Sequence, residues 1–284
     1  LLLAAGAGIA ARPARAAAPS RIITVGGAVT EMVFALGAGN RIIAVDSTSS
    51  FPAPVRALPQ IGYSRALAPE GLIALRPDLL LMSEEAGPAQ ALAVLRAAGA
   101  PMAMIPEGHN GPEIARNIEA VGRALGIDAA PVAEAVRADW AALDAPIAAL
   151  PKVRAIFVMS SSRGAPLAAG RNTQADAILQ AAGATNVVTS YAGYRPLSAE
   201  AAAQLAPEAV VMMDHSVAAA GGIDALLSIP AFAVTPVAQS RRIVTIEGSY
   251  GLGFGPRAAH ARYDLALALH PGANLPTLPR RAWV

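Results

Sequence analysis

Short apolar segments alternate with helical segments along most of this chain, and this alternation restricts its fold more than any other feature. The segments of strand length cover residues 21–25, 41–46, 78–82, 101–105 and 153–159. The helical segments between the earlier ones cover residues 29–37, 69–77, 88–99 and 112–126. Strands that alternate with helices form a parallel sheet with helices on both faces. We therefore predict an α/β fold with mainly parallel central sheets.

The second half of the chain repeats features of the first half. One predicted helix ends at Gly37 and another at Gly183, 146 residues later, and an asparagine and a strand accompany each glycine. Glu70 and Glu200 each open a helix, and each lies seven residues before a proline that precedes an acidic residue and an apolar strand. These two glutamates are 130 residues apart, so the halves differ by deletions. We infer two similar lobes with a ligand cleft between them, at the carboxyl ends of the strands.

A single long helix is predicted to join the lobes. Apolar residues recur at spacings of three and four from residue 132 to residue 150, which indicates one buried helical stripe. Asp128 is a suitable N-cap, and Pro146 should kink the helix near its end. One stiff connection should allow little lobe movement. The predicted units are an export signal remnant (1–16), an N-terminal lobe (17–127), the linking helix (128–150) and a C-terminal lobe (151–284).

The first twenty residues read LLLAAGAGIAARPARAAAPS, an apolar stretch followed by small residues. Ala14-Arg15-Ala16 fits the small-x-small pattern at the cleavage site of an export signal. An initiating Met and a charged leading region are missing, so we expect the signal to be truncated at its start; a disordered alanine-rich tail is the alternative. No later apolar run is long enough to span a bilayer. We predict an exported, periplasmic protein.

The composition argues against several classes of function. The chain has no cysteine, which excludes disulfides, thiolate metal sites, Fe–S clusters and cysteine nucleophiles. The net charge is +2, and no basic run is interleaved with aromatic residues, so nucleic-acid binding is not indicated. No G-x-S-x-G motif is present, and the four histidines lack metal-motif spacing. We predict a binding protein and not an enzyme.

Four segments in order resemble the haem-binding periplasmic proteins of bacterial haem-uptake ABC transporters. They are residues 21–46, residues 61–81 (IGYSRALAPEGLIALRPDLLL), residues 168–186 and residues 251–257 (GLGFGPR). These proteins belong to a helix-linked class of substrate-binding proteins that also serves cobalamin and siderophores. The resemblance implies haem as the transported ligand, delivery to an ABC permease and its ATPase at the inner membrane, and a monomer.

The resemblance assigns Tyr63 as the axial ligand of the haem iron. A phenolate is a hard anionic donor that suits ferric iron. Because free tyrosine has a pKa near ~10, the iron and a nearby cation must favour the deprotonated form. Arg65 follows two residues later; in an extended segment it points away from Tyr63 and would serve a haem propionate. A tyrosine in a surface loop is the alternative.

His215 is the second candidate ligand of the iron, because it follows a predicted strand and should face the cleft. Relatives often carry an arginine here that hydrogen-bonds the tyrosinate. Three roles stay open for this histidine: ligand on the other face of the haem, hydrogen-bond partner of Tyr63, or cap of its own loop. Some relatives supply a second histidine ligand from the loop that corresponds to residues 159–166, where this chain has serines.

Haem also needs partners for its propionates and apolar walls for its ring. The propionate candidates on predicted cleft loops are Arg65, Arg163, Arg171, Ser161 and Ser162. The wall candidates are Tyr191, Tyr194, Tyr250, Leu252 and Phe254, of which Phe254 is equally suited to the core.

Paired glutamates in this class dock onto arginines of the permease, and the resemblance implies this role for Glu70 and Glu200. An acidic residue in the first turn also complements the helix dipole, which explains both without a partner. Glu31, in another early helical turn, is a weaker docking candidate. Two rival functions remain: binding of a ferric siderophore or cobalamin on the same scaffold, and a haem-handling enzyme such as a chelatase.

Overall fold

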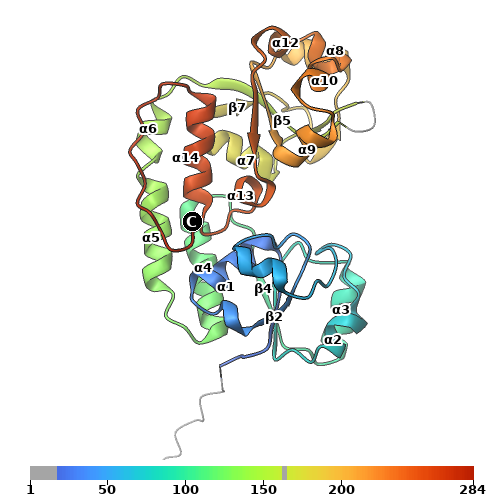
Figure 1. Cartoon of the computed structure of the whole chain (residues 1–284), viewed down its shortest axis with the longest axis vertical. Coiled ribbons are helices and arrows are strands. Elements are labelled where there is room, and N and C mark those ends of the chain that lie inside the picture. Colours follow the sequence, from blue (N-terminus) through green and yellow to red (C-terminus); the bar gives the residue numbers. More distant parts are fainter. Residues whose placement is uncertain (1–17, 162–164) are drawn as a thin grey trace, which may run out of the picture.

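The computed structural model describes residues 18–161 and 165–284, so the predicted export signal and the two candidates Ser162 and Arg163 lie outside the described residues. Within the described part the chain forms two α/β lobes, one above the other, with helices along one side of both (Figure 1). The α/β fold expected from the alternation of strands and helices is confirmed.

The N-terminal lobe has a four-stranded sheet in which all pairs are parallel. Its strands, in spatial order, are β2 (Ile42–Val45), β1 (Ile22–Val25), β3 (Leu79–Ser83) and β4 (Met102–Ile105). Its helices are α1 (Gly27–Ala35), α2 (Pro69–Ala74), α3 (Ala89–Ala97) and α4 (Gly111–Leu125). Ile22 packs among residues of α1 and α4, whereas Ile23 packs among residues of α2 and α3. Successive side chains of a strand point to opposite faces, so helices cover both faces of the sheet.

The C-terminal lobe repeats this sheet order and adds two antiparallel strands. Four parallel strands lie in the order β7 (Ala184–Asn186), β5 (Val153–Ser160), β9 (Ala209–Met213) and β10 (Ile243–Ile246). This order matches β2-β1-β3-β4, which is the repeat that the two glycines and the two glutamates indicate. Strand β6 (Leu167–Ala169) pairs antiparallel with β5, and β8 (Tyr194–Pro196) pairs antiparallel with β6, so this sheet is mixed.

The helices of the C-terminal lobe are mostly short. They are α7 (Gln174–Ala181), α8 (Ala199–Leu205), α9 (Asp214–Ala219), α10 (Ile223–Leu227), α11 (Pro230–Ala233), α12 (Pro236–Ser240), α13 (Gly248–Leu252) and α14 (Ala258–Leu269). Two 3-10 turns, Gly39–Arg41 and Ala53–Ala57, lie in the N-terminal lobe.

The linking segment is two helices, α5 (Ala130–Ala141) and α6 (Asp144–Ala148), and not one kinked helix. Pro146 has no N–H group to donate to the carbonyl of Ala142, and the helix is interrupted between Ala141 and Asp144. The expected apolar stripe is buried, with Trp140 at 6% exposure and Leu143 at 0%.

Helix α14 and the residues after it lie beside the linking helix α5 (Figure 1). Arg262 of α14 donates to the Trp140 carbonyl at 2.9 Å and to the Ala181 carbonyl at 2.8 Å. Near the end of the chain, Arg281 donates to both carboxylate oxygens of Asp139, at 2.6 and 2.8 Å. Helix α14 and the C-terminal residues are therefore fastened to the linking helix by hydrogen bonds at Trp140 and Asp139.

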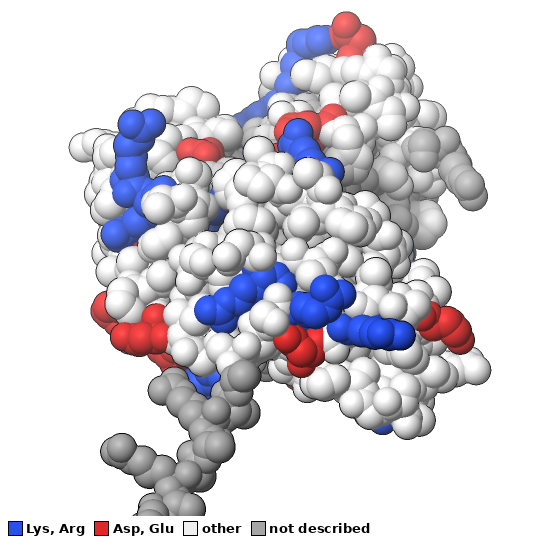
Figure 2. All heavy atoms as spheres, turned by 60° about the horizontal axis from the view of Figure 1, so that its bottom comes forward, with Lys and Arg blue, Asp and Glu red and all other residues white. Residues whose placement is uncertain are grey.

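The surface carries few charges, in keeping with a charged content of 15%. Figure 2 shows acidic and basic side chains scattered over a face that is otherwise mostly uncharged. Among the residues that the structure describes, no helix has the length and apolarity needed to cross a membrane.

Candidate ligand cleft

A cleft of about 450 Å³ lies between the lobes, at the carboxyl ends of the parallel strands. From the N-terminal lobe its lining includes residues that follow β1, β2, β3 and β4; from the C-terminal lobe it includes residues next to β5, β9 and β10. The large apolar side chains of the lining include Val29, Met32, Ile105, Met159, Leu252 and Phe254. This position is the one predicted for a ligand in a two-lobed α/β protein.

Tyr63 stands in this cleft with 48% of its surface exposed. Gly62 has a φ of 88°, a conformation that L side chains rarely adopt, and its carbonyl accepts a hydrogen bond from the Ser47 N–H at 2.8 Å. A turn follows, in which the Ala66 N–H donates to the Tyr63 carbonyl at 2.9 Å. The backbone is therefore fixed on both sides of Tyr63, while its phenol remains free to contact a ligand.

Arg65 lies on the same side as Tyr63, contrary to the expectation from an extended segment. The turn from Tyr63 to Ala66 brings the guanidinium back, where it forms an ion pair with Glu85. The hydrogen bond that Arg65 donates to Glu85 is the main reason why the pKa of Arg65 lies above its usual value, and the charge of Tyr63 acts in the same direction. The cleft therefore has a permanent cation beside the tyrosine.

Two glutamates and a glutamine form a polar contact across the cleft, which the sequence analysis missed. Gln174 of the C-terminal lobe donates to Glu107 at 2.7 Å and to Glu85 at 3.4 Å. Thr173 caps α7 by accepting from the Asp176 N–H at 3.0 Å, which places Gln174 in the first turn. Glu85 and Glu107 follow β3 and β4 closely, so the rule that ligands bind at strand ends pointed to both positions.

The two carboxyl groups have opposite pKa shifts. Burial, together with the neighbouring Glu85, raises the pKa of Glu107 to about 7. Burial alone would raise the pKa of Glu85. The hydrogen bonds that its carboxylate accepts from Glu107 and Arg65 outweigh this effect, so the pKa of Glu85 lies below its ordinary value. Two adjacent carboxyl groups favour sharing one proton, which here resides on Glu107.

His215 lines the cleft from the C-terminal lobe, in the first turn of α9 and not in a loop. It lies close to Gly248, where an added Cβ would be 3.6 Å from the His215 ring and 3.0 Å from the Met213 sulfur. A side chain at position 248 would therefore crowd the sulfur of Met213, whereas its Cβ would make an ordinary van der Waals contact with the histidine.

The other predicted contacts divide into two groups. Tyr194, Leu252 and Phe254 line the cleft, as expected for its walls. Phe254 is also 4% exposed and packs against His109, with ring centroids 5.5 Å apart.

Four other predicted residues do not line the cleft: Arg171, Ser161, Tyr191 and Tyr250. The Tyr250 hydroxyl donates to Asp264 of α14 at 2.7 Å, and burial followed by this acidic neighbour raises the pKa of Tyr250. The Tyr191 hydroxyl donates to the Ala168 carbonyl at 3.2 Å. These tyrosines therefore serve the C-terminal lobe itself.

Glu70 and Glu200 are both exposed, in the first turns of α2 and α8. These helices lie in different lobes, on the side of the molecule away from α5 and α14 (Figure 1). The backbone N–H of Glu200 and the Ser198 hydroxyl lower the pKa of the Glu200 carboxyl. Both acids are thus accessible and lie toward the same side.

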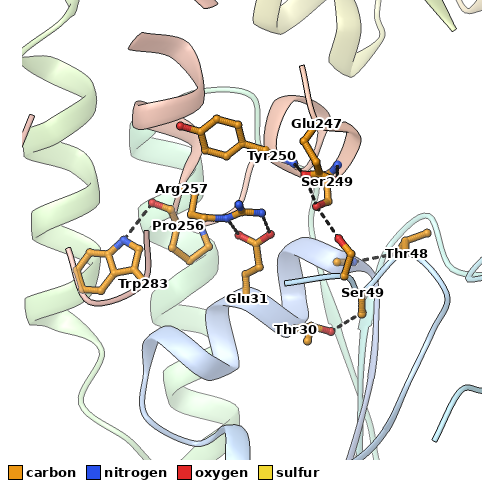
Figure 3. A network of polar contacts seen from close by, with 12 residues as sticks. Thr30, Glu31, Thr48, Ser49, Glu247, Ser249, Tyr250, Pro256, Arg257 and Trp283 are labelled. Carbon is orange, nitrogen blue, oxygen red and sulfur yellow. Dashed lines mark hydrogen bonds and ion pairs between the residues drawn. The ribbon is translucent and has the colours of Figure 1, made fainter. Parts of the chain in front are cut away.

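Glu31 is not a docking residue, because it is buried at 5% exposure inside the junction of the lobes. Its carboxylate accepts two hydrogen bonds from Arg257, at 2.9 and 2.6 Å (Figure 3). The Arg257 guanidinium stacks over Phe51 at 3.8 Å. Nearby, the hydroxyls of Ser50 and Ser249 are hydrogen-bonded at 2.9 Å, also between the lobes. Neither the repeat nor the motif predicted this contact.

Comparison with known proteins covers nearly the whole chain. The family model described as "Periplasmic binding protein" matches residues 22–250. The periplasmic heme-binding protein BhuT, solved with two hemes, is 39% identical with a TM-score of 0.82, over 88% of this chain and 98% of BhuT. The apo periplasmic heme-binding protein RhuT from Roseiflexus sp. RS-1 is 34% identical with a TM-score of 0.85, over 90% and 99%.

Curated sequences add a broader set of relatives. The uncharacterized ABC transporter substrate-binding lipoprotein YvrC of Bacillus subtilis (strain 168) is 23% identical over 259 residues, 89% of this chain and 81% of YvrC. A vitamin B12-binding protein of Pectobacterium carotovorum is 36% identical over 76 residues only, 27% of this chain and 28% of that protein. The resemblance inferred from the motifs is confirmed.

The raised pKa of Glu107 predicts a specific pH dependence of stability. Between its ordinary value of 4.5 and about 7, the folded protein holds a proton that the unfolded chain releases. The contribution of Glu107 to stability therefore falls as the pH rises through this window. Glu107→Gln should gain stability relative to wild type when thermal unfolding is measured at pH 8 instead of pH 5.

Glu84→Gln is the matched control, because Glu84 is an exposed neighbour of the pair. Its difference from wild type should not change with pH. The lowered pKa of Glu85 acts in the opposite direction, toward loss of stability as the pH falls below 4.5. A Glu107→Gln effect that is equal at both pH values would contradict the shared proton.

Proposed function

The chain belongs to the periplasmic binding protein family, and we propose that it captures ferric haem in the interlobe cleft and delivers it to an ABC permease. The observation that carries this proposal is the half-exposed Tyr63, which a glycine and a turn hold in the cleft between the lobes. Similarity to two periplasmic heme-binding proteins over nearly the whole chain supports the same ligand.

The surroundings of Tyr63 suit iron in its ferric form. A phenolate is a hard anionic donor, and tyrosine is an established haem ligand. The guanidinium of Arg65 places a positive charge next to this phenol in the cleft. The apolar lining from Met32, Ile105 and Leu252 offers surfaces for a porphyrin ring.

His215 enters the same cleft from the opposite lobe, and we assign it to the second side of the haem. Its imidazole suits two roles there, as a ligand of the iron or as a hydrogen-bond partner of the tyrosinate. Two strong ligands give a low-spin ferric iron, whereas a tyrosinate alone gives a high-spin iron. The absorption spectrum therefore distinguishes the two roles.

Glu70 and Glu200 are proposed as the contacts with the permease. Each is an exposed acid at the start of a short helix, one in each lobe, and α2 and α8 lie toward the same side of the molecule. Two carboxylates at a fixed spacing suit two arginines on a partner, because guanidinium and carboxylate groups pair with defined geometry. The name of YvrC as an ABC transporter substrate-binding lipoprotein supports this context.

Binding of cobalamin is the second candidate, favoured by the partial match to a vitamin B12-binding protein. That match spans about a quarter of this chain, whereas the match to BhuT spans 88%. The cleft also offers a tyrosine for iron, which a corrinoid with its own cobalt ligands does not require.

Titration of the apo-protein with hemin, followed by visible absorption, tests the proposed ligand. We expect saturable binding with a tyrosinate-type ferric spectrum, and loss of that spectrum in Tyr63→Phe, which keeps the ring and removes the phenolate. Tyr263→Phe on α14 is the control and should bind as wild type does. Absence of saturable binding would sink the haem proposal and move cobalamin and ferric siderophores forward. Consumption of the bound haem would instead indicate an enzyme.

Transport into proteoliposomes that contain the cognate permease and ATPase tests the docking surface. Glu70→Lys and Glu200→Lys should each lower haem transport by about tenfold or more, since like charges opposed across an interface cost several kcal/mol. Hemin binding should not change in either variant. Glu134→Lys on α5 serves as the control, because this exposed acid lies away from α2 and α8. Unchanged transport in the double variant would remove the docking role.

A further inference from the structure

Arg65, a cation that lines the cleft, is occupied by a carboxylate of the protein itself. Among the described residues that line the cleft, Arg65 is the only arginine or lysine. Its guanidinium forms an ion pair with Glu85, and the two side chains are 50% and 37% exposed. A ligand that enters the cleft therefore meets a guanidinium that is accessible but already paired.

Glu85 is held in this position from several sides. Gln174 reaches across from the other lobe and donates to it at 3.4 Å, while making its shorter hydrogen bond to Glu107 at 2.7 Å. The Ser83 hydroxyl accepts from the backbone N–H of Glu85 at 3.3 Å. The carboxylate is thus retained in the cleft whether or not Arg65 stays bound to it.

The other charged groups described near the cleft, Glu247 and Arg257, offer no further cation to an anionic ligand. The carboxylate of Glu247 is directed to the backbone of Ser249 and Tyr250, and it adds negative charge to the lining. The guanidinium of Arg257 is already paired with the carboxylate of Glu31 behind the cleft. Within the described residues, a ligand carboxylate that pairs with an arginine of the cleft must compete with Glu85 for the guanidinium of Arg65.

We propose that Glu85 is an internal competitor for the carboxylates of the ligand: it occupies Arg65 in the empty cleft and gives it up when a ligand carboxylate binds. This inference rests on the proposed function, in which the ligand is haem with its two propionates. One carboxylate replaces another, so Arg65 is never left unpaired. A ligand carboxylate must break the Arg65–Glu85 ion pair, and the free energy of this pair lowers the affinity for that ligand.

Through this competition Glu85 would set the affinity and specificity of the cleft for carboxylate-bearing ligands, although it does not itself attract them. A partly exposed ion pair is weak, so its removal should strengthen binding by only about two- to fivefold. A ligand of the same shape without carboxylates leaves the Arg65–Glu85 pair in place and gains nothing from the removal of Glu85.

The test compares hemin with hemin dimethyl ester, which has the same ring and iron but no free carboxylates. Both ligands are titrated at pH 8 into wild type, Glu85→Gln, Arg65→Ala and the double variant. We expect Glu85→Gln to bind hemin about two- to fivefold more tightly and the ester unchanged. In the Arg65→Ala background the same substitution should have no effect, as a double-mutant cycle requires for a coupled pair.

Glu107→Gln is the matched control, since it removes a neighbouring negative charge without removing the partner of Arg65. Any gain that it causes should persist in the Arg65→Ala background. Hemin affinity of Glu85→Gln that is equal to or weaker than wild type would overturn the competition, as would an equal gain for the ester. If wild type itself fails to bind hemin, the proposed function falls and this inference falls with it. Saturable binding by wild type without a gain in Glu85→Gln removes the inference alone.

Discussion

The buried ion pair between Glu31 and Arg257 fixes how the two lobes face each other, and the cleft depends on it. Glu31 lies on α1, one turn after the glycines that line the cleft, and Arg257 directly follows the segment that carries Phe254. Loss of either partner would leave an uncompensated charge in a buried place, which is strongly unfavourable. The pair therefore ties the lining of one lobe to the lining of the other.

The remaining contacts between the lobes act in the same sense. The Ser50–Ser249 hydrogen bond and the edge-to-face contact of His109 with Phe254 lie around the cleft. Arg262 and Arg281 hold α14 and the C-terminal residues to α5 and α6. A cleft bounded by this many fixed contacts is formed before the ligand arrives. Such a site favours exchange of side-chain partners inside the cleft, as proposed for Arg65, over a wide hinge movement.

Much of the fold follows from local patterns in the sequence. The alternation of strands and helices predicts parallel sheets. The recurrence of Gly37 and Glu70 as Gly183 and Glu200 predicts two similar lobes, and in the structure their parallel strands share one order. The linking segment was predicted as one helix because its apolar stripe is continuous, yet Pro146 removes a hydrogen bond from it. A buried apolar stripe depends on the spacing of side chains, whereas a continuous helix depends on backbone hydrogen bonds. The stripe can therefore continue where the helix is interrupted.

The site was less accessible to sequence reasoning, because it is built from contacts between distant residues. The sequence predicts correctly that Tyr63 and His215 face the cleft. It predicts wrongly that Arg65 points away from Tyr63, because the residues after Tyr63 form a turn and not an extended segment. In the sequence Glu31 is a weaker docking candidate by its place in an early helical turn, and its partner Arg257 cannot be recognised locally because it lies 226 residues away. Glu85 and Glu107 each lie two residues after a strand, which is where ligand-binding residues occur, but they belong to no recognisable motif.

A crystal structure of the protein loaded with hemin tests the central claim most directly, because it locates the iron and the lobes together. The account predicts an iron atom bonded to the Tyr63 oxygen inside the cleft, with the Glu31–Arg257 pair intact and the lobes in the same relative position. Iron bound outside the cleft, or a rotation of the lobes that separates Glu31 from Arg257, would contradict it.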